Sequence, residues 1–233
     1  MDYRDTPQEA AFRAEARAWF ADNTSQDWTH VEDEQEQTRL RREWHQKLYK
    51  AGYAGMAWPT EYGGRGLGQS EQLAFLEEAY IAGAPIPFVT LGTVGPALME
   101  HGSEEHKQFF LPKIAGGEIH FAIGYTEPGS GTDLASLTTR AERVDGGCSL
   151  TGQKVWTTMA HIANWGICLA RTEPDAPKHN GITCFIVDMK TPGIEIRPLK
   201  ELTGAEMFNE VFFDDVFVPD ACVVGEVNHG WEA

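Results

Sequence analysis

The segment Tyr125–Asp133, YTEPGSGTD, gathers residue types that can bind a polar ligand. Two glycines flank a serine, after a proline and beside hydroxyl and carboxyl side chains. Glycine lets a backbone approach a ligand closely because it has no Cβ, and the N–H groups of such a turn can hold a phosphate or the polar edge of a ring. A plain turn between two strands is the alternative, and it is the commoner meaning of such a segment taken alone.

A second segment, Gly152–Thr158 (GQKVWTT), combines an aromatic face with hydroxyl donors. Trp156 stands near the end of an expected strand and is followed by Thr157 and Thr158, a combination that suits a flat heteroaromatic ligand such as a flavin. A core tryptophan between strand threonines is the simpler interpretation of this segment alone. The two segments follow one another in the same half of the chain, and together they favour a shared binding site.

The first half of the chain shows the periodicity of helices. Leu40, Trp44 and Leu48 recur every four residues, which predicts one buried helix face. Ser70 and Ser103 are predicted to cap two further helices, because a serine oxygen accepts hydrogen bonds from the free N–H groups of a first turn.

From Gly116 onward the helical periodicity gives way to short apolar stretches, which predict strands. An Asp145-Gly146 turn predicts a hairpin between two of them. The expected strands are Phe121–Tyr125, Leu137–Val144, Cys148–Thr151, Trp165–Arg171, Ile182–Met189, Glu210–Phe213 and Val216–Val218. We therefore expect an α+β chain, with an all-α domain over residues 1–117 and a β-barrel or sandwich-like domain over residues 118–233.

The composition excludes several classes of function. The formal net charge is -16, from 35 acidic and 19 basic residues, whereas nucleic-acid surfaces and electrostatic contacts with anionic lipid need basic patches. Acidic residues are frequent in the first 36 positions, where we expect a solvated face. No apolar run approaches the roughly 20 residues of a membrane span, and no histidine or cysteine pattern predicts a metal site. Scattered cysteines and a polar N-terminus favour a cytoplasmic location.

Together, TEPGSGTD and GQKVWTT resemble the two flavin-contacting motifs of the acyl-CoA dehydrogenases. The resemblance extends in register from about residue 5 to the last residue, and five further segments carry it. They are PTEYGGRG (59–66), FLPKIAGGE (110–118), ANW (163–165), TPGIEI (191–196) and FNEVFFDDVFVP (208–219).

The resemblance implies an FAD-dependent oxidoreductase that dehydrogenates an acyl-CoA thioester at its α and β carbons. In that family Thr126 would bond the isoalloxazine, Trp156 would pack against it and Thr158 would lie at its N5 edge, while Gly131 and Thr132 would lie near the pyrophosphate and the acyl-CoA. The implied cofactor-binding residues are Ile123, Gly124, Tyr125, Thr126, Gly131, Thr132, Trp156, Thr157 and Thr158, and Thr132 is also the implied substrate-binding residue. Thr132 departs from the serine usual there, and Thr157 from a larger apolar residue.

The family's catalytic base is a glutamate on a C-terminal four-helix domain, which normally follows the segment matching Gly225–Trp231 (GEVNHGW). Only Glu232 and Ala233 follow that segment here, so no residue is assigned as the catalytic base. Glu127 lies in the flavin motif, but the family pattern gives it a role in the loop's own structure. The chain is therefore expected to be a fragment of a longer protein or a subunit that depends on another chain.

Other functions are compatible with the same architecture. An acyl-CoA oxidase and a flavin monooxygenase share it, and a non-catalytic or truncated subunit that binds flavin or acyl-CoA is the alternative from a different class. The resemblance implies an acyl-CoA substrate, an electron-transfer flavoprotein as acceptor, and a homo- or hetero-oligomer. The sequence is most similar to bacterial members of the family that handle bulky, branched or sterol-derived acyl groups in fatty acid or sterol side-chain metabolism.

Overall fold

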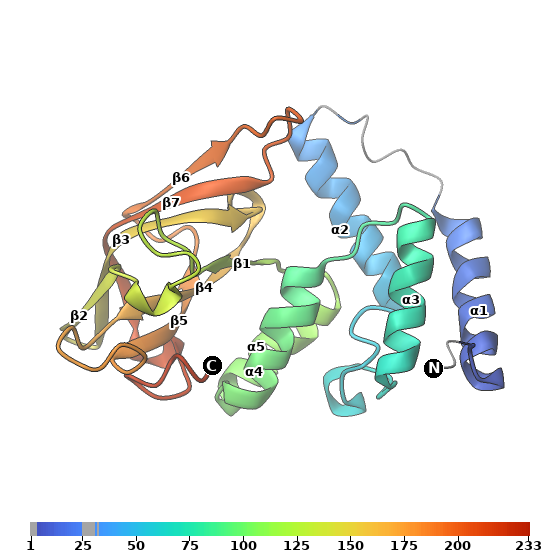
Figure 1. The fold of residues 1–233 in the computed structure, drawn as a ribbon, viewed down its shortest axis with the longest axis horizontal. Helices are drawn as coiled ribbons and strands as arrows, with labels where there is room; N and C mark the ends of the chain where they lie inside the picture. Colours follow the sequence, from blue (N-terminus) through green and yellow to red (C-terminus); the bar gives the residue numbers. More distant parts are fainter. Residues whose placement is uncertain (1–3, 25–30, 32) are drawn as a thin grey trace. The chain divides into compact units, whose positions relative to one another are not determined.

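The computed structural model describes residues 4–24, 31 and 33–233. The chain forms two compact units, drawn in Figure 1. The first contains residues up to Gly92 together with Pro112–Glu118, and the second contains Thr93–Leu111 and Ile119–Ala233. The acidic residues Asp2, Asp27 and Glu32 of the expected solvated face lie outside the described residues, whereas Asp5, Glu15, Asp22 and Asp33 are exposed.

The first unit is built on the helices α1 (Pro7–Asn23), α2 (Glu34–Lys50) and α3 (Gln69–Ile81). The predicted face of α2 is confirmed, since Trp44 and Leu48 are buried and Leu40 is half-buried. Aromatic rings fill the space between the helices, with ring centroids 5.0–6.5 Å apart among Phe12, Trp19, Phe20, Trp44, Tyr53 and Phe75.

The prediction of Ser70 as the N-cap of α3 is wrong. Gly68 holds the N-cap position with an extended backbone, so the helix begins two residues earlier, at Gln69, and Ser70 lies inside its first turn. The glycine ends the preceding loop, which contains a short 3-10 turn at Thr60–Tyr62. For α1, Thr6 and Glu9 form a reciprocal capping box, which satisfies two N–H groups that the helix itself leaves unpaired.

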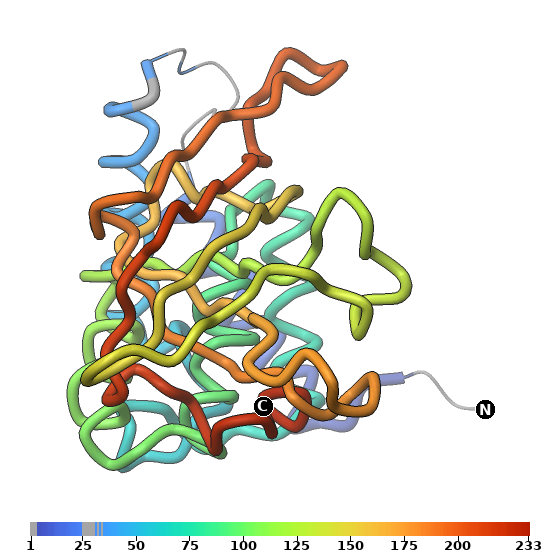
Figure 2. Tube along the Cα trace, turned by 90° about the vertical axis from the view of Figure 1, so that its left-hand side faces the viewer, coloured from blue at the N-terminus to red at the C-terminus, as the bar shows by residue number. Residues whose placement is uncertain are grey.

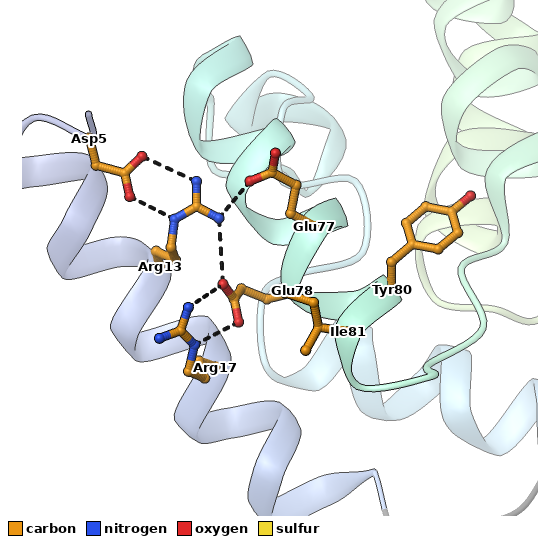
Figure 3. Close-up of a pocket in the computed structure, with 7 residues that line it drawn as sticks. All are labelled: Asp5, Arg13, Arg17, Glu77, Glu78, Tyr80 and Ile81. Carbon is orange, nitrogen blue, oxygen red and sulfur yellow. Dashed lines mark hydrogen bonds and ion pairs between the residues drawn. The ribbon is translucent and has the colours of Figure 1, made fainter. Parts of the chain in front are cut away.

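An ion-pair cluster joins α1 to α3 (Figure 3). The Glu78 carboxylate, 2% exposed, accepts two hydrogen bonds from Arg17, each 2.8 Å long, and a longer one of 3.4 Å from Arg13. The Arg17 guanidinium, aided by Arg13, lowers the pKa of Glu78 against the opposing effect of burial. Arg13 also pairs with Asp5 and Glu77. The charged groups around this surface pocket therefore pair with one another.

The second unit begins with the helix α4 (Gly95–His101) and takes in the first part of α5 (Glu104–Ala115). The prediction of Ser103 as a cap is confirmed, because its Oγ accepts a hydrogen bond from the His106 N–H at 3.2 Å. His106 is buried, and its Nε2 lies 2.6 Å from the carbonyl of Ala221. That contact fixes the start of α5 against the segment that follows the last long strand.

One mixed sheet organises the second unit, in the strand order β6-β7-β3-β2-β4-β5-β8, with β1 pairing parallel to β4. The strands are β1 (Phe121–Gly124), β2 (Arg140–Val144), β3 (Gly147–Thr158), β4 (Trp165–Arg171), β5 (Ile182–Asp188), β6 (Ile194–Leu199), β7 (Phe208–Pro219) and β8 (Val223–Val224). The predicted fold class, a helical region followed by a β domain, is confirmed. The predicted hairpin is also present, since β2 pairs antiparallel with β3 and Gly146 is left-handed at φ +75°.

The two strands expected at Glu210–Phe213 and Val216–Val218 are one strand, β7. Its ladder with β3 shifts register between Phe213 and Val216, where Asp215 takes a left-handed conformation with φ +52°. A bulge therefore replaces the expected break. Figure 2 shows two segments that project from this sheet, the yellow-green loop after β1 and the orange hairpin between β6 and β7.

Removal of the buried carboxylate between α1 and α3 should destabilise the first unit. We expect Glu78→Ala to lower the free energy of unfolding by about 2 kcal/mol, because two guanidinium groups lose their buried partner. Water can hydrate the exposed guanidinium of Arg17 after the change, and this offsets part of the loss. Glu77→Ala, at an exposed position, should change it by less than about 0.5 kcal/mol. Urea denaturation of both variants measures the difference, and equal effects would contradict the assignment.

Gly152 lies where a side chain has no room. A Cβ there would lie 2.5 Å from the Oγ1 and 2.7 Å from the Cα of Thr139. Because backbone atoms must move, we expect Gly152→Ala to cost about 1–3 kcal/mol of stability. Gly129→Ala is the control, since a Cβ there has no atom within 4 Å. Thermal unfolding of the two variants should separate them clearly; a stable Gly152→Ala protein would refute this packing.

Candidate functional site

The first candidate segment forms a closed turn after β1. Glu127 and Ser130 exchange two backbone hydrogen bonds of 3.0 and 3.1 Å, with Pro128 and Gly129 exposed at the tip. Proline suits the first central position of such a turn because its φ is preset. Gly131 and Thr132 follow and are exposed, so this part of the backbone is accessible to a ligand.

The Glu127 carboxylate lies under the turn and is 4% exposed. One oxygen accepts hydrogen bonds from Lys154 Nζ and the Thr139 N–H, both at 2.8 Å; the other accepts from the N–H of Thr138 at 2.6 Å and its hydroxyl at 2.9 Å. Burial alone would raise the pKa of this carboxyl, but the Lys154 ammonium and these hydrogen bonds outweigh it and lower the pKa to about 2. All four contacts lie within the fold, as a structural role requires.

Lys154, in the second candidate segment, bonds directly to the first. Its ammonium is fully buried and donates to the carbonyl of Tyr125 at 3.1 Å as well as to Glu127. The next residue on β3, Val155, donates its N–H to the carbonyl of Thr126 at 2.9 Å. The structure therefore places the two segments side by side.

Trp156 does not belong to the core, so the simpler interpretation of this residue is wrong. It is 57% exposed, at a register shift where Lys154 pairs with Val211 but Thr157 with Asn209. Its backbone is left-handed, with φ +60°, which is uncommon for a non-glycine residue and marks a special position. The indole contacts the Phe208 ring edge-on, at 5.9 Å between centroids.

The predicted cofactor-binding residues differ in exposure. Thr126, Thr158, Ile123 and Tyr125 are half-buried. Thr157 and Gly124 are buried and line a small internal cavity among apolar side chains of the sheet. The Thr157 hydroxyl has no hydrogen-bond partner in the part of the chain that the structure describes. The side chain of Thr157 is therefore turned inward, whereas that of the preceding residue, Trp156, is exposed.

Two polar residues near the site were not among the sequence predictions. The amide of fully buried Asn209 donates to the carbonyl of Thr157 at 3.0 Å, and its oxygen lies 2.9 Å from His161 Nδ1. This clamp holds β3 just beyond Trp156. The available signal was Asn209 within FNEVFFDDVFVP, an amide next to the apolar residues of an expected strand.

The end of the first segment is fixed by surface contacts. Lys178 pairs with Asp133 at 2.5 Å, and Arg171 donates to the carbonyl of Ala135 at 2.6 Å. The described residues contain no cluster of histidine, cysteine or carboxylate side chains able to hold a metal ion. None of the helices that the structure describes combines the length and apolar character needed to cross a membrane.

Comparisons with known proteins relate both the helical and the β region of the chain to one family. The acyl-CoA dehydrogenase N-terminal domain matches residues 6–118, and the acyl-CoA dehydrogenase middle domain matches residues 122–216. Two acyl-CoA dehydrogenases of Mycobacterium tuberculosis are similar: FadE34, 54% identical over 79% of this chain and 26% of its own length, and FadE29, 44% identical over 97% and 58%.

Solved structures show the same fold. A chain of the ChsE4-ChsE5 complex from Mycobacterium tuberculosis has a TM-score of 0.91 and 39% identity, over 100% of this chain and 59% of its own. The Tcur3481-Tcur3483 steroid ACAD has a TM-score of 0.89 and 41% identity, over 100% and 60%. This chain thus spans less than two thirds of each of these relatives. Since both domain matches and these relatives cover its helical and β regions, the chain belongs to the acyl-CoA dehydrogenase family.

Proposed function

We propose that this chain forms the flavin-facing part of an enzyme that dehydrogenates an acyl-CoA thioester at its α and β carbons with FAD. The observation that carries the proposal is the hydrogen bond between Val155 N–H and the carbonyl of Thr126, which joins the two motif segments beside the exposed indole of Trp156. Neither segment alone distinguishes a ligand site from an ordinary turn or strand, but their juxtaposition favours one shared site.

The residues present suit FAD. The exposed indole of Trp156 offers a flat face to a fused ring system, and the hydroxyls of Thr126 and Thr158 are near enough to the surface to bond its polar edge. Exposed Gly131 and Thr132 leave backbone N–H groups accessible to a phosphate. Ile123, Gly124, Tyr125 and buried Thr157 stay in the proposed site as residues that the family resemblance implies. FAD held by these residues would supply the acceptor for the hydride of the β carbon.

The reaction also needs a base, because the α proton of a thioester is only weakly acidic and a positioned carboxylate must remove it. Glu127 does not suit this role, since four hydrogen bonds engage its carboxylate and its pKa is lowered. We therefore do not assign the base to Glu127, and we propose that the base comes from another segment of the complete gene product or from a partner subunit.

Substrate and partners are proposed from the relatives. One similar structure is named a steroid ACAD, and another is a complex of two differently named chains. From these names we propose a bulky, sterol-derived acyl-CoA as substrate and a hetero-oligomer as the working assembly. The family resemblance adds an electron-transfer flavoprotein as the proposed acceptor, and the scattered cysteines and polar N-terminus favour the cytoplasm as the proposed location. Within the chain, we propose that the helical domain ends at residue 117 and the β domain begins at residue 118.

A hydroxyl at Thr158 should contribute to cofactor binding. In the complete gene product we expect Thr158→Ala to weaken FAD binding about twofold to tenfold or to slow flavin reduction, as loss of one hydrogen bond predicts. Thr151→Ala is the matched control, because Thr151 lies on the same strand but bonds exposed Asp215. Fluorescence titration and stopped-flow reduction give the two values. If neither changes, the role of Thr158 is wrong.

Residues 1–233 alone should bind FAD poorly and show no dehydrogenase turnover. The family's flavin is also held by the C-terminal domain and a neighbouring subunit, and each 1.4 kcal/mol of lost contact costs about tenfold in affinity. Leu73, Tyr80 and Ile81 on α3 are exposed apolar side chains, which should promote self-association. The visible spectrum after FAD addition and gel filtration, with acyl-CoA and artificial-acceptor assays, provides the test. A stoichiometrically flavinated, active chain would refute this expectation.

A further inference from the structure

Lys154 is an unusual residue for the middle of a sheet. Its side chain is fully buried, and its ammonium has two oxygen partners, the Glu127 carboxylate at 2.8 Å and the Tyr125 carbonyl at 3.1 Å. Burying a charged pair costs so much hydration that apolar residues of the same size often give equal or greater stability. Stability alone therefore does not account for a lysine at this position.

The contact of Lys154 with Tyr125 determines how the following peptide is oriented. The carbonyl of Tyr125 and the N–H of Thr126 belong to one planar trans peptide, so they point in opposite directions. With the carbonyl turned toward the buried ammonium, the N–H of Thr126 points away from it. That N–H makes no backbone hydrogen bond among the described residues. An ammonium on the carbonyl also polarises the peptide, which strengthens the N–H as a donor.

Glu127 holds the ammonium in place. Its carboxylate is fixed independently by the N–H groups of Thr138 and Thr139, so Lys154 contacts an anion that the segment just before β2 keeps stationary. The adjacent carbonyl of Thr126 is held by Val155. Two successive carbonyls of the loop are therefore fixed to β3, one of them by a full charge.

We propose that Lys154, anchored by Glu127, is a positioning residue that aims the Thr126 N–H at the ring edge of the flavin. The inference rests on the proposed function and adds to it a buried pair that does not itself touch the cofactor. A purely structural pair would stabilise the fold and have no separate effect on FAD affinity. The two roles are therefore separable by experiment.

The test compares the complete gene product with Lys154→Met, Glu127→Gln and the double variant, measuring thermal stability and FAD affinity for each. Each single variant leaves one buried group without its charged partner and should lose stability. The double variant removes both charges, so most of that stability should return. Its FAD affinity should stay about tenfold to a hundredfold below wild type, because no ammonium holds the Tyr125 carbonyl.

Lys190→Met is the matched control, since it removes an exposed lysine that follows β5 and lies outside both motif segments; FAD affinity should not change. Recovery of wild-type FAD affinity in the stable double variant would overturn the proposal. A double variant that fails to fold would also count against it, because the pair would then be a requirement of the fold itself. If the wild-type protein binds no FAD, the proposed function fails instead.

Discussion

One buried charge pair, Glu127 with Lys154, fixes the loop after β1 to the sheet of the second unit. It joins the loop after β1, the segment just before β2 and the strand β3. A carboxylate is stable at that depth only because an ammonium and three hydrogen bonds from Thr138 and Thr139 compensate its lost hydration. The loop can therefore be rigid while its tip remains open to solvent, the combination that a ligand-binding loop requires.

The same strand that buries Lys154 exposes Trp156. In a regular strand, residues two apart lie on one face, so these two side chains would share an environment. The register shift between Lys154 and Thr157 separates them, and the left-handed backbone of Trp156 is its consequence. Such a conformation persists only where the surroundings enforce it. Here Asn209 enforces it by holding the carbonyl of Thr157.

Local patterns in the sequence predict much of this structure. The apolar run Trp165–Arg171 coincides with β4, and Asp145-Gly146 forms the predicted turn because glycine accepts a positive φ. The features that local patterns do not predict have causes elsewhere in the chain. Alternation cannot predict that Lys154 is buried, since its anion lies 27 residues earlier. Nor can propensity predict the bulge at Asp215 or the inward turn of Thr157, because both arise from the pairing of β3 with β7. Local patterns therefore predict most of the strands, but not which side chains of β3 face inward.

The most direct test of this account is the ionisation of Glu127 in the folded protein, followed by ¹³C NMR of glutamate carboxyl groups and assigned with Glu127→Gln. The pKa is lowered in the folded state from an ordinary value near 4.5 to about 2. The pair should therefore stabilise the protein fully above pH 4.5, and that stabilisation should be lost as the pH falls toward 2. A resonance that titrates well below the ordinary glutamate range would support the account. Titration near 4.5, without loss of stability across this interval, would contradict it.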